Sequence, residues 1–182
     1  MFKPRTSGQR GFTLIEMIFV VSIIALLSSV VFGTLAEARK NARDRLRIGH
    51  MQQAVLASRL YAEKYGTYHI PGTGKNGTGN GWFPFENGSG YTKSTAEALY
   101  DEGFLDEEIH DPLVPIDSYN VGDHYQYMRY FPPDGENSGV CYFAQLEKPK
   151  AENLEAFENA KVGDSIKNSL KNNYNMNYAQ CI

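Results

Sequence analysis

The chain has 182 residues, of which 42% are hydrophobic and 21% are charged. This balance fits one modest globular domain with an accessory segment, and it excludes a disordered tail or a multidomain enzyme. The formal net charge of -3 gives no general attraction to phosphate backbones, so nucleic acid is not an expected partner.

A short basic leader comes first. Residues 1–11 read MFKPRTSGQRG and carry Lys3, Arg5 and Arg10 without any acidic side chain. Positive charge next to an apolar segment favours the cytoplasmic side of a membrane, so the N-terminus is expected in the cytoplasm. Residues 39–47 are also basic, and the expected orientation therefore depends on the leader.

An apolar segment follows at residues 12–36 and contains a single ionisable side chain, Glu16. As a helix it would be about 37 Å long, enough to cross a bilayer core of about 30 Å. It is longer than the apolar region of a cleaved signal peptide, which has about 7 to 15 residues. The sequence Ala-Glu-Ala at residues 36–38 has the form of a signal-peptidase site, so a secreted product is an alternative.

Glu16 is costly in such a helix. Insertion scales assign an acidic residue at the membrane centre roughly 2.5 to 3.5 kcal/mol. Between Arg10 and Arg39 the chain has no Lys or Arg, so this helix supplies no basic partner. The partner is expected from another chain or from a newly made terminus.

Gly11 followed by FTLIE, behind a basic leader, resembles the class III signal of type IV pilins and of type II secretion pseudopilins. The resemblance implies that a prepilin peptidase cuts between Gly11 and Phe12 and methylates the new amine of Phe12. It implies an inner-membrane precursor with one membrane pass, which an inner-membrane assembly platform extracts into a helical homo-oligomer. The new α-amino group is positively charged near neutral pH and would pair with Glu16 of a neighbouring subunit, which sets the register.

Residues 37–65 continue the helix in amphipathic form. The expected apolar face contains Ile48, Met51, Val55, Ala62 and Tyr65, with Leu56 and Leu60 close by. Arg47 is expected on the polar face, and the basic residues 39–47 are expected to contact other subunits or lipid headgroups, with DNA as a further option.

No proline interrupts residues 12–65, which predicts a single long helix. Many type IV pilins have proline where this chain has Gly33. Glycine costs about 1 kcal/mol relative to alanine, so the helix is expected to be weakest at Gly33.

Residues 66–182 are expected to form a globular head. A capped helix is predicted at 94–100, an antiparallel strand pair at 124–131 and 140–147, a helix at 151–161, and an irregular Asn-rich tail. This order resembles the type IV pilin-like α+β fold, in which a long N-terminal helix packs on a small antiparallel sheet.

Two cysteines, Cys141 and Cys181, lie in the last third of the chain. An even count in a part expected outside the cytosol favours a disulfide, with two free thiols as the alternative. A disulfide-bounded C-terminal region resembles that of many type IV pilins, whereas major pseudopilins often lack it.

No catalytic site is expected. The four histidines lack zinc-site spacing, and no nucleophile elbow or phosphate loop is present. Asp134, Glu136 and Asn137 offer oxygen ligands at the short spacing that calcium favours; the alternative is an exposed acidic turn, and no other cofactor is expected.

The sequence therefore predicts a structural subunit of a type IV pilus, located first in the inner membrane and then in a surface fibre. The alternative within the same resemblance is a type II secretion pseudopilin in a periplasmic pseudopilus. An alternative from another class is a membrane-tethered or secreted enzyme or binding module.

Overall fold

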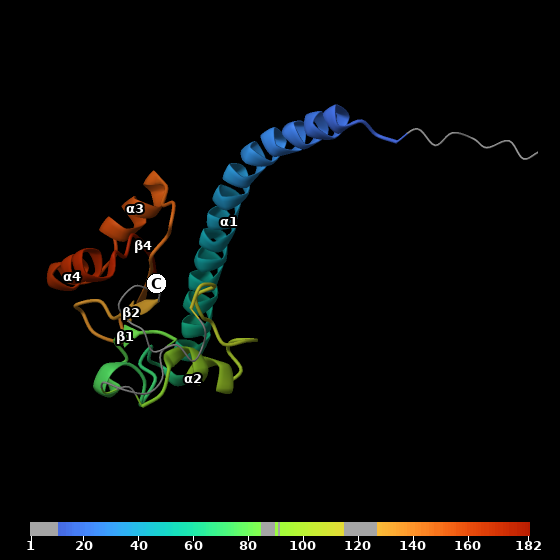
Figure 1. Ribbon diagram of the computed structural model, residues 1–182. Coiled ribbons are helices and arrows are strands. Elements are labelled where there is room, and N and C mark those ends of the chain that lie inside the picture. Colours follow the sequence, from blue (N-terminus) through green and yellow to red (C-terminus); the bar gives the residue numbers. More distant parts are fainter. Residues whose placement is uncertain (1–10, 85–89, 91, 115–126) are drawn as a thin grey trace, which may run out of the picture. The chain divides into compact units, whose positions relative to one another are not determined.

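The computed structural model of the chain describes residues 11–84, 90, 92–114 and 127–182. Two compact units are present, Met1–Arg39 and Lys40–Ile182. Figure 1 shows the elements along the chain: α1 (Leu14–Tyr65), η1 (Lys75–Gly77), β1 (Gly81–Trp82), α2 (Thr95–Asp101), β2 (Met128–Tyr130), β3 (Cys141–Ala144), α3 (Ala151–Glu158), α4 (Asp164–Tyr174) and β4 (Tyr178–Cys181). The expected α+β fold, with a long N-terminal helix and a small antiparallel sheet, is confirmed.

Helix α1 alone, among the described helices, is long and apolar enough to cross a membrane. Its most apolar window of 18 residues has a mean hydropathy of 2.6, and none of that window is buried against other parts of the chain. The helix begins two residues after Phe12 and ends before Gly66, which adopts a left-handed φ of 76°. Glycine has no Cβ, so this conformation is accessible to it without steric cost.

The second unit is built on a four-stranded sheet in the order β1-β2-β3-β4, and every neighbouring pair is antiparallel. Strand β3 is central, since it pairs with β2 on one side and with β4 on the other. The expected hairpin of β2 and β3 is present, although residues 124–126 of the first predicted strand lie outside the described residues.

Both strands of this hairpin are shorter than predicted. Pro132 and Pro133 follow β2 and have no N–H group for a ladder, so they end that strand. Beyond β3 the backbone N–H groups bond to side chains instead of a strand: that of Leu146 donates to Asn177, and those of Glu147 and Lys148 donate to Asp44.

Side chains on the two faces of β3 belong to two separate hydrophobic clusters. Tyr142 and Ala144 pack in a cluster with the second half of α1 and with α2. Cys141 and Phe143 pack in a second cluster beneath α3 and α4. Alternate residues of a strand point to opposite faces, so a strand covered on both faces is buried along its whole length.

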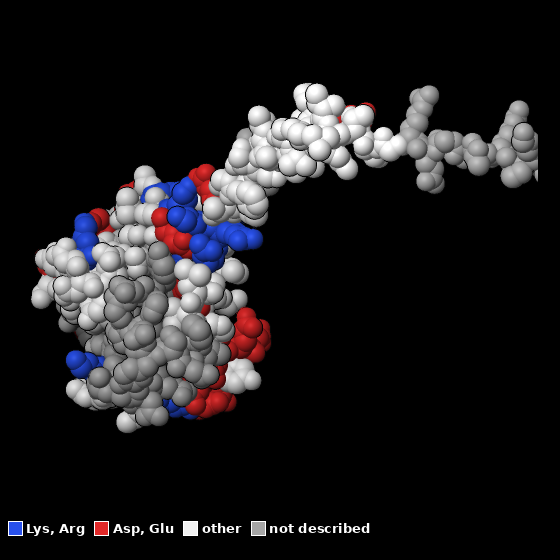
Figure 2. Space-filling model, viewed as in Figure 1, with Lys and Arg blue, Asp and Glu red and all other residues white. Residues whose placement is uncertain are grey.

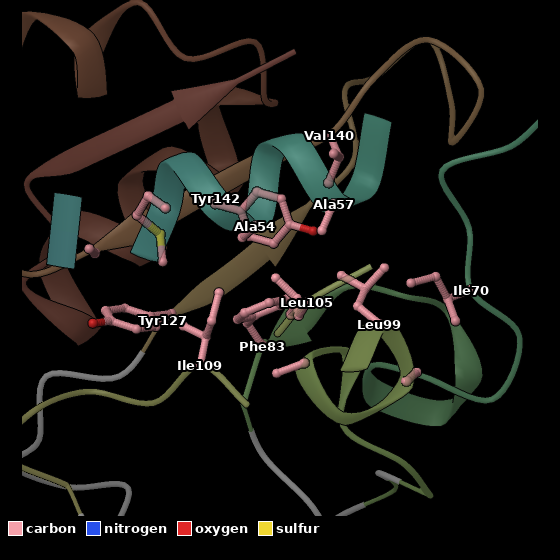
Figure 3. Close-up of a cluster of buried hydrophobic side chains, with 14 of the residues drawn as sticks. Ala54, Ala57, Ile70, Phe83, Leu99, Leu105, Ile109, Tyr127, Val140 and Tyr142 are labelled. Carbon is pink, nitrogen blue, oxygen red and sulfur yellow. The ribbon is translucent and has the colours of Figure 1, made fainter. Parts of the chain in front are cut away.

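The first cluster holds α1 against the sheet through small residues. Figure 3 shows Ala54 and Ala57 of α1 beside Tyr142, whose hydroxyl lies 2.5 Å from that of Ser58. Met51 and Tyr61 extend the same buried line, which runs at three- and four-residue spacing. Alanine lets the helix approach the strand closely, and Ser58 gives the buried hydroxyl of Tyr142 a hydrogen-bond partner.

The predicted apolar face of α1 is partly wrong. Leu56, Leu60 and Tyr65 are 56%, 41% and 45% exposed, whereas Arg47 is fully buried. The buried face is rotated toward Asp44, Arg47, Ala54 and Ala57 because a network of ion pairs satisfies its polar members, as described below. Hydrophobicity alone could not indicate that a guanidinium lies inside.

The prediction for the structure of the C-terminal tail is also wrong. In place of an irregular tail, residues 164–174 form α4 and residues 178–181 form β4. Ile166, Leu170 and Tyr174 recur at four-residue spacing and pack into the second cluster, a period that the many asparagines obscured. Asn175 ends α4 in the left-handed conformation that asparagine tolerates, with φ 52°.

The two shorter head helices behave differently. The capped helix predicted at 94–100 is present as α2, and Ser94 caps it by accepting a hydrogen bond from the backbone N–H of Glu97. Helix α3 ends at Glu158 instead of residue 161, and Ala160 and Val162 turn their side chains into the second cluster.

Cys141 and Cys181 form a disulfide with a sequence separation of 40. The two residues are direct partners in the register of β3 and β4. Closing a loop of this length stabilises the fold by about 4 kcal/mol on the chain-entropy account. The bond therefore fastens β4 to the central strand.

Candidate assembly site on the N-terminal helix

Thr13 and Glu16 form a capping box at the start of α1. The backbone N–H and the hydroxyl of Thr13 each donate to Oε2 of Glu16 at 2.8 Å, and the backbone N–H of Glu16 donates to Oγ1 of Thr13 at 3.4 Å. Such reciprocal bonds satisfy donors that a helix N-terminus leaves without partners. Glu16 thus has a role within its own chain that its charge alone did not reveal, although the Thr-x-x-Glu spacing is visible in the sequence.

The surface of this part of α1 is apolar on all sides and is not covered by the described residues. Phe12 is 82% exposed, and the large apolar side chains behind it are 42% to 80% exposed: Leu14, Ile15, Met17, Ile18, Phe19, Val20, Val21, Ile23, Ile24, Leu26, Leu27, Phe32 and Leu35. Figure 2 shows this segment almost without charge, with acidic atoms at its start. A helix that is hydrophobic all round requires lipid or other apolar helices around it.

Two serine side chains inside the apolar segment bond to their own helix. The hydroxyl of Ser22 donates to the carbonyl of Ile18 at 2.7 Å, and that of Ser29 donates to the carbonyl of Leu26 at 2.8 Å. Their hydroxyls therefore carry little desolvation cost in an apolar environment. Glu16 is the one ionised side chain in the segment.

Helix α1 continues through Gly33 without a break. A Cβ placed on Gly33 would meet no atom within 4 Å, so nothing described in the chain requires glycine there. That the helix is weakest at Gly33 stays a prediction.

The basic residues after the apolar segment do not act as one group. Arg43 and Arg47 turn toward the head and bond to its carboxylates, while Arg39, Lys40 and Arg45 are exposed and form no ion pair with a described residue. Figure 2 shows Lys and Arg mixed with Asp and Glu at one end of the head. The expected contact with other subunits or headgroups therefore applies to the three exposed residues only.

Arg47 is the centre of a buried ionic network that joins α1 to two loops. Its Nε and Nη2 donate to the two carboxylate oxygens of Asp111 at 2.7 and 3.2 Å, and its Nη1 donates to Asp44 at 2.9 Å and to Glu147 at 3.0 Å. Arg43 adds a second two-point pair with Glu147, at 2.6 and 2.7 Å. Every carboxylate in this network, which we call the Arg47 network, has a partner.

Protonation in the Arg47 network follows these contacts. Burial lowers the pKa of Arg47, but hydrogen bonds and charge from Asp111, Glu147 and Asp44 outweigh burial and raise it above its usual value. The hydrogen bonds from Arg43 hold the pKa of Glu147 below its usual range. The ion pairs of the network fix the second half of α1 on the head.

His50 lies next to this network and makes the head sensitive to mild acid. Its Nδ1 is 2.9 Å from the Tyr127 hydroxyl, and burial, followed by the charge of His110, lowers its pKa against the opposing charges of Glu107 and Asp111.

Because the pKa of His50 is lowered in the folded state, a falling pH protonates the unfolded state first. The contribution of His50 to the free energy of unfolding is therefore complete above about pH 6.5, the ordinary pKa of histidine, and falls as the pH drops below that value. We expect His50→Gln to flatten this dependence between about pH 6.5 and pH 5 in urea unfolding. One group changes the slope by at most about 1.4 kcal/mol per pH unit, and an unchanged slope in the variant would contradict this assignment.

The candidate calcium ligands lie at the β2–β3 turn. Asp134, Glu136 and Asn137 are exposed, and Glu136 lies 3.4 Å from Nδ1 of His69. Within the described ranges no group of three or more His, Cys, Asp or Glu side chains is placed to hold a metal ion. Calcium binding by these three residues stays a prediction.

Comparison with known proteins supports the reading of the N-terminus. Residues 6–32 match the family described as the prokaryotic N-terminal methylation motif. The chain is 40% identical over 52 residues to the type IV wide pilus major component PilA4 of Thermus thermophilus, which covers 29% of this chain. The match spans 40% of the length of that relative. No solved structure matches this chain.

The methylation motif lies at the start of the long apolar helix, and a disulfide-closed α+β head follows that helix. The comparisons therefore show an N-terminal methylation motif and a partial similarity to a pilus component, on a chain whose helix α1 is long and apolar enough to cross a membrane.

Proposed function

We propose that the chain is cut between Gly11 and Phe12, methylated at Phe12, and assembled through α1 into a helical pilus of identical copies. The observation that carries the proposal is the uncovered apolar surface of residues 14–36 of α1, in which Glu16 is the single acidic or basic residue. Outside lipid, this surface needs apolar neighbours on every side, and further copies of α1 supply them.

In this proposal Glu16 receives the charge that the cut creates. The new α-amino group of Phe12 is positively charged near neutral pH. Oε2 of Glu16 is occupied by Thr13, whereas Oε1 accepts no hydrogen bond from a described residue and is open to a neighbour's amine. A wrong register would leave charges unpaired in a low dielectric, at a cost of several kcal/mol.

The proposal includes the membrane stage. The precursor crosses the inner membrane once, with residues 1–11 in the cytoplasm where a prepilin peptidase cuts them, and an assembly platform transfers α1 into the fibre. A type II secretion pseudopilin would share these steps and would form a periplasmic pseudopilus instead. Extracellular fibres that contain this chain distinguish the pilus from the pseudopilus.

Mass spectrometry of the mature N-terminus tests the proposal. The expected first residue is methylated Phe12, and the apolar segment is retained. A chain that keeps residues 1–11, or one that begins at Arg39 after a cut behind Ala38, would contradict it.

A further inference from the structure

Two Asn-Gly dipeptides lie close together in one described loop of the head. They are Asn76-Gly77 and Asn80-Gly81, and a further one, at residues 87–88, lies outside the described residues. Asparagine is a thermolabile residue, and it loses its amide most readily before glycine, which has no side chain to shield its backbone nitrogen. Both described dipeptides have the same intrinsic chemistry, so a difference in their reactivity must come from the fold.

The loss of the amide is an intramolecular substitution followed by hydrolysis. The backbone nitrogen of the glycine forms a bond to Cγ of the asparagine and gives up its proton. The bond between Cγ and Nδ2 breaks, and Nδ2 takes up that proton and leaves as ammonia. Water then opens the resulting succinimide ring and gives aspartate or isoaspartate. Water is the one co-reactant, and no oxidant or reductant takes part.

Asn76 and Gly77 are the central residues of a type I′ turn. Their φ angles are 53° and 73°, and ψ of Asn76 is 32°. The backbone N–H of Thr78 closes the turn by donating to the carbonyl of Lys75 at 3.2 Å. In this form the nitrogen of Gly77 points away from the side chain of Asn76, so the ring cannot close without a rotation of the backbone.

Rotation of a single peptide plane brings the reacting atoms together. Turning the plane between Asn76 and Gly77 converts the type I′ turn to type II′, in which ψ of Asn76 is about −120° and φ of Gly77 is negative. At this ψ the nitrogen of Gly77 lies on the same side of the Cα–C bond as Cβ, within reach of Cγ. Asparagine tolerates the positive φ that both turn types require at its position, and glycine accepts either sign.

Little in the described part of the chain resists this rotation. The one hydrogen bond that the plane makes with a described residue runs from the N–H of Gly77 to the carbonyl of Gly74, at 3.3 Å. The adjacent planes are anchored and need not move: the N–H of Asn76 donates to the carbonyl of Gly90 at 2.7 Å, and Nε2 of His69 lies 2.9 Å from the carbonyl of Gly77. The side chain of Asn76 is exposed.

Asn80-Gly81 is fixed where Asn76-Gly77 is free. The carbonyl of Asn80 accepts a hydrogen bond from the N–H of Lys75 at 2.8 Å, and Gly81 belongs to β1, where it pairs with Arg129 of β2. Rotation of the plane between Asn80 and Gly81 would break both interactions. In addition, Oδ1 of Asn80 accepts a hydrogen bond from the N–H of Phe131 at 2.9 Å, which fixes the side chain to the end of β2.

We infer that Asn76 is a site of spontaneous deamidation in the folded chain and that the fold protects Asn80. The product adds one negative charge to an exposed turn beside Lys75. Isoaspartate also adds a methylene group to the main chain, which is incompatible with the type I′ turn. The modification concerns the head alone, so it is independent of the proposed assembly function.

Site-resolved mass spectrometry of the full chain tests the inference. The folded chain is incubated in detergent at mildly alkaline pH and digested at acid pH, and fragmentation distinguishes asparagine, aspartate and isoaspartate at each position. Deamidation at Asn76 is expected to be at least about tenfold faster than at Asn80, where two additional hydrogen bonds must open first. Equal rates at the two positions, or a faster rate at Asn80, would overturn the inference.

Two controls assign the difference to the fold and to residue 76. In the chain unfolded by urea, Asn76 and Asn80 should react at similar rates, and a difference as large as in the folded chain would show that the fold is not its cause. In Asn76→Asp the rapid gain of acid in this loop should vanish while the rate at Asn80 stays unchanged. A rapid phase that survives in this variant would contradict the assignment to Asn76.

Discussion

Replacing Arg47 with methionine is expected to reduce the free energy of unfolding by about 3 to 5 kcal/mol, the cost of removing one partner of a buried ion pair. Methionine keeps much of the side-chain volume but leaves Asp111, whose side chain is fully buried, without its two-point partner. The network also joins α1 to two distant loops, so its loss releases the helix from the head. Urea unfolding of the full chain in detergent, followed by the fluorescence of Trp82, the single tryptophan, measures the change.

Two controls make this prediction specific. Lys64→Met also removes one positive charge from α1, but its pair with Glu102 is exposed, and little change is expected. Adding Asp111→Asn to Arg47→Met removes the stranded charge while keeping an acceptor for the Leu113 N–H, so part of the lost stability should return. Equal effects of Arg47→Met and Lys64→Met would contradict the role of the network.

Glu16 substitutions are expected to abolish or strongly reduce fibre assembly while leaving the cut between Gly11 and Phe12 intact. Glu16→Val removes both the charge and the capping box with Thr13. Glu16→Gln removes the charge and keeps an oxygen that can accept the two bonds from Thr13. If pairing with the neighbour's amine is the main role, both variants are processed and neither forms fibres.

Comparing the two variants separates helix capping from charge pairing. Loss of a cap costs a helix about 1 kcal/mol, which is small beside several kcal/mol for an unpaired charge in a low dielectric. Fibres from Glu16→Gln at the normal level would show that capping, and not the charge, is the important property. Mass spectrometry for processing and electron microscopy for fibres are the measurements.

The fold was predictable where the signal is local. The run of apolar residues without proline gave the extent of α1 to within two residues at its start, and Ser94 with Glu97 gave the start of α2. The cysteine count favoured the disulfide that is observed. In each case the physical cause lies in residues close together in the sequence or in a simple count of one residue type.

The buried face of α1 was not predictable because its cause lies far away in the chain. Arg47 is buried because Asp111 and Glu147 reach it, and neither has a spacing relation to α1 that a periodicity could reveal. Only the pair of Asp44 and Arg47, three residues apart, was visible locally. The leucines that seemed to belong to the core, Leu56 and Leu60, are exposed instead.

The prediction of an irregular tail at the end of the chain was wrong for another reason. Asparagine is a poor helix former, and its frequency in residues 164–178 suggested irregular structure. Tertiary packing of Ile166, Leu170 and Tyr174 overrides that preference. The edge strand β4 is then positioned by β3 and by the disulfide.

The Arg47 network also limits when the head can finish folding during synthesis of the chain. Its contacts span 64, 100 and 104 residues, so the network cannot be completed on the ribosome until the chain has been extended past Glu147. Contacts of such long range make folding slow. The apolar segment of α1 is synthesised long before that point, so under the proposed function it can enter the membrane before the head closes.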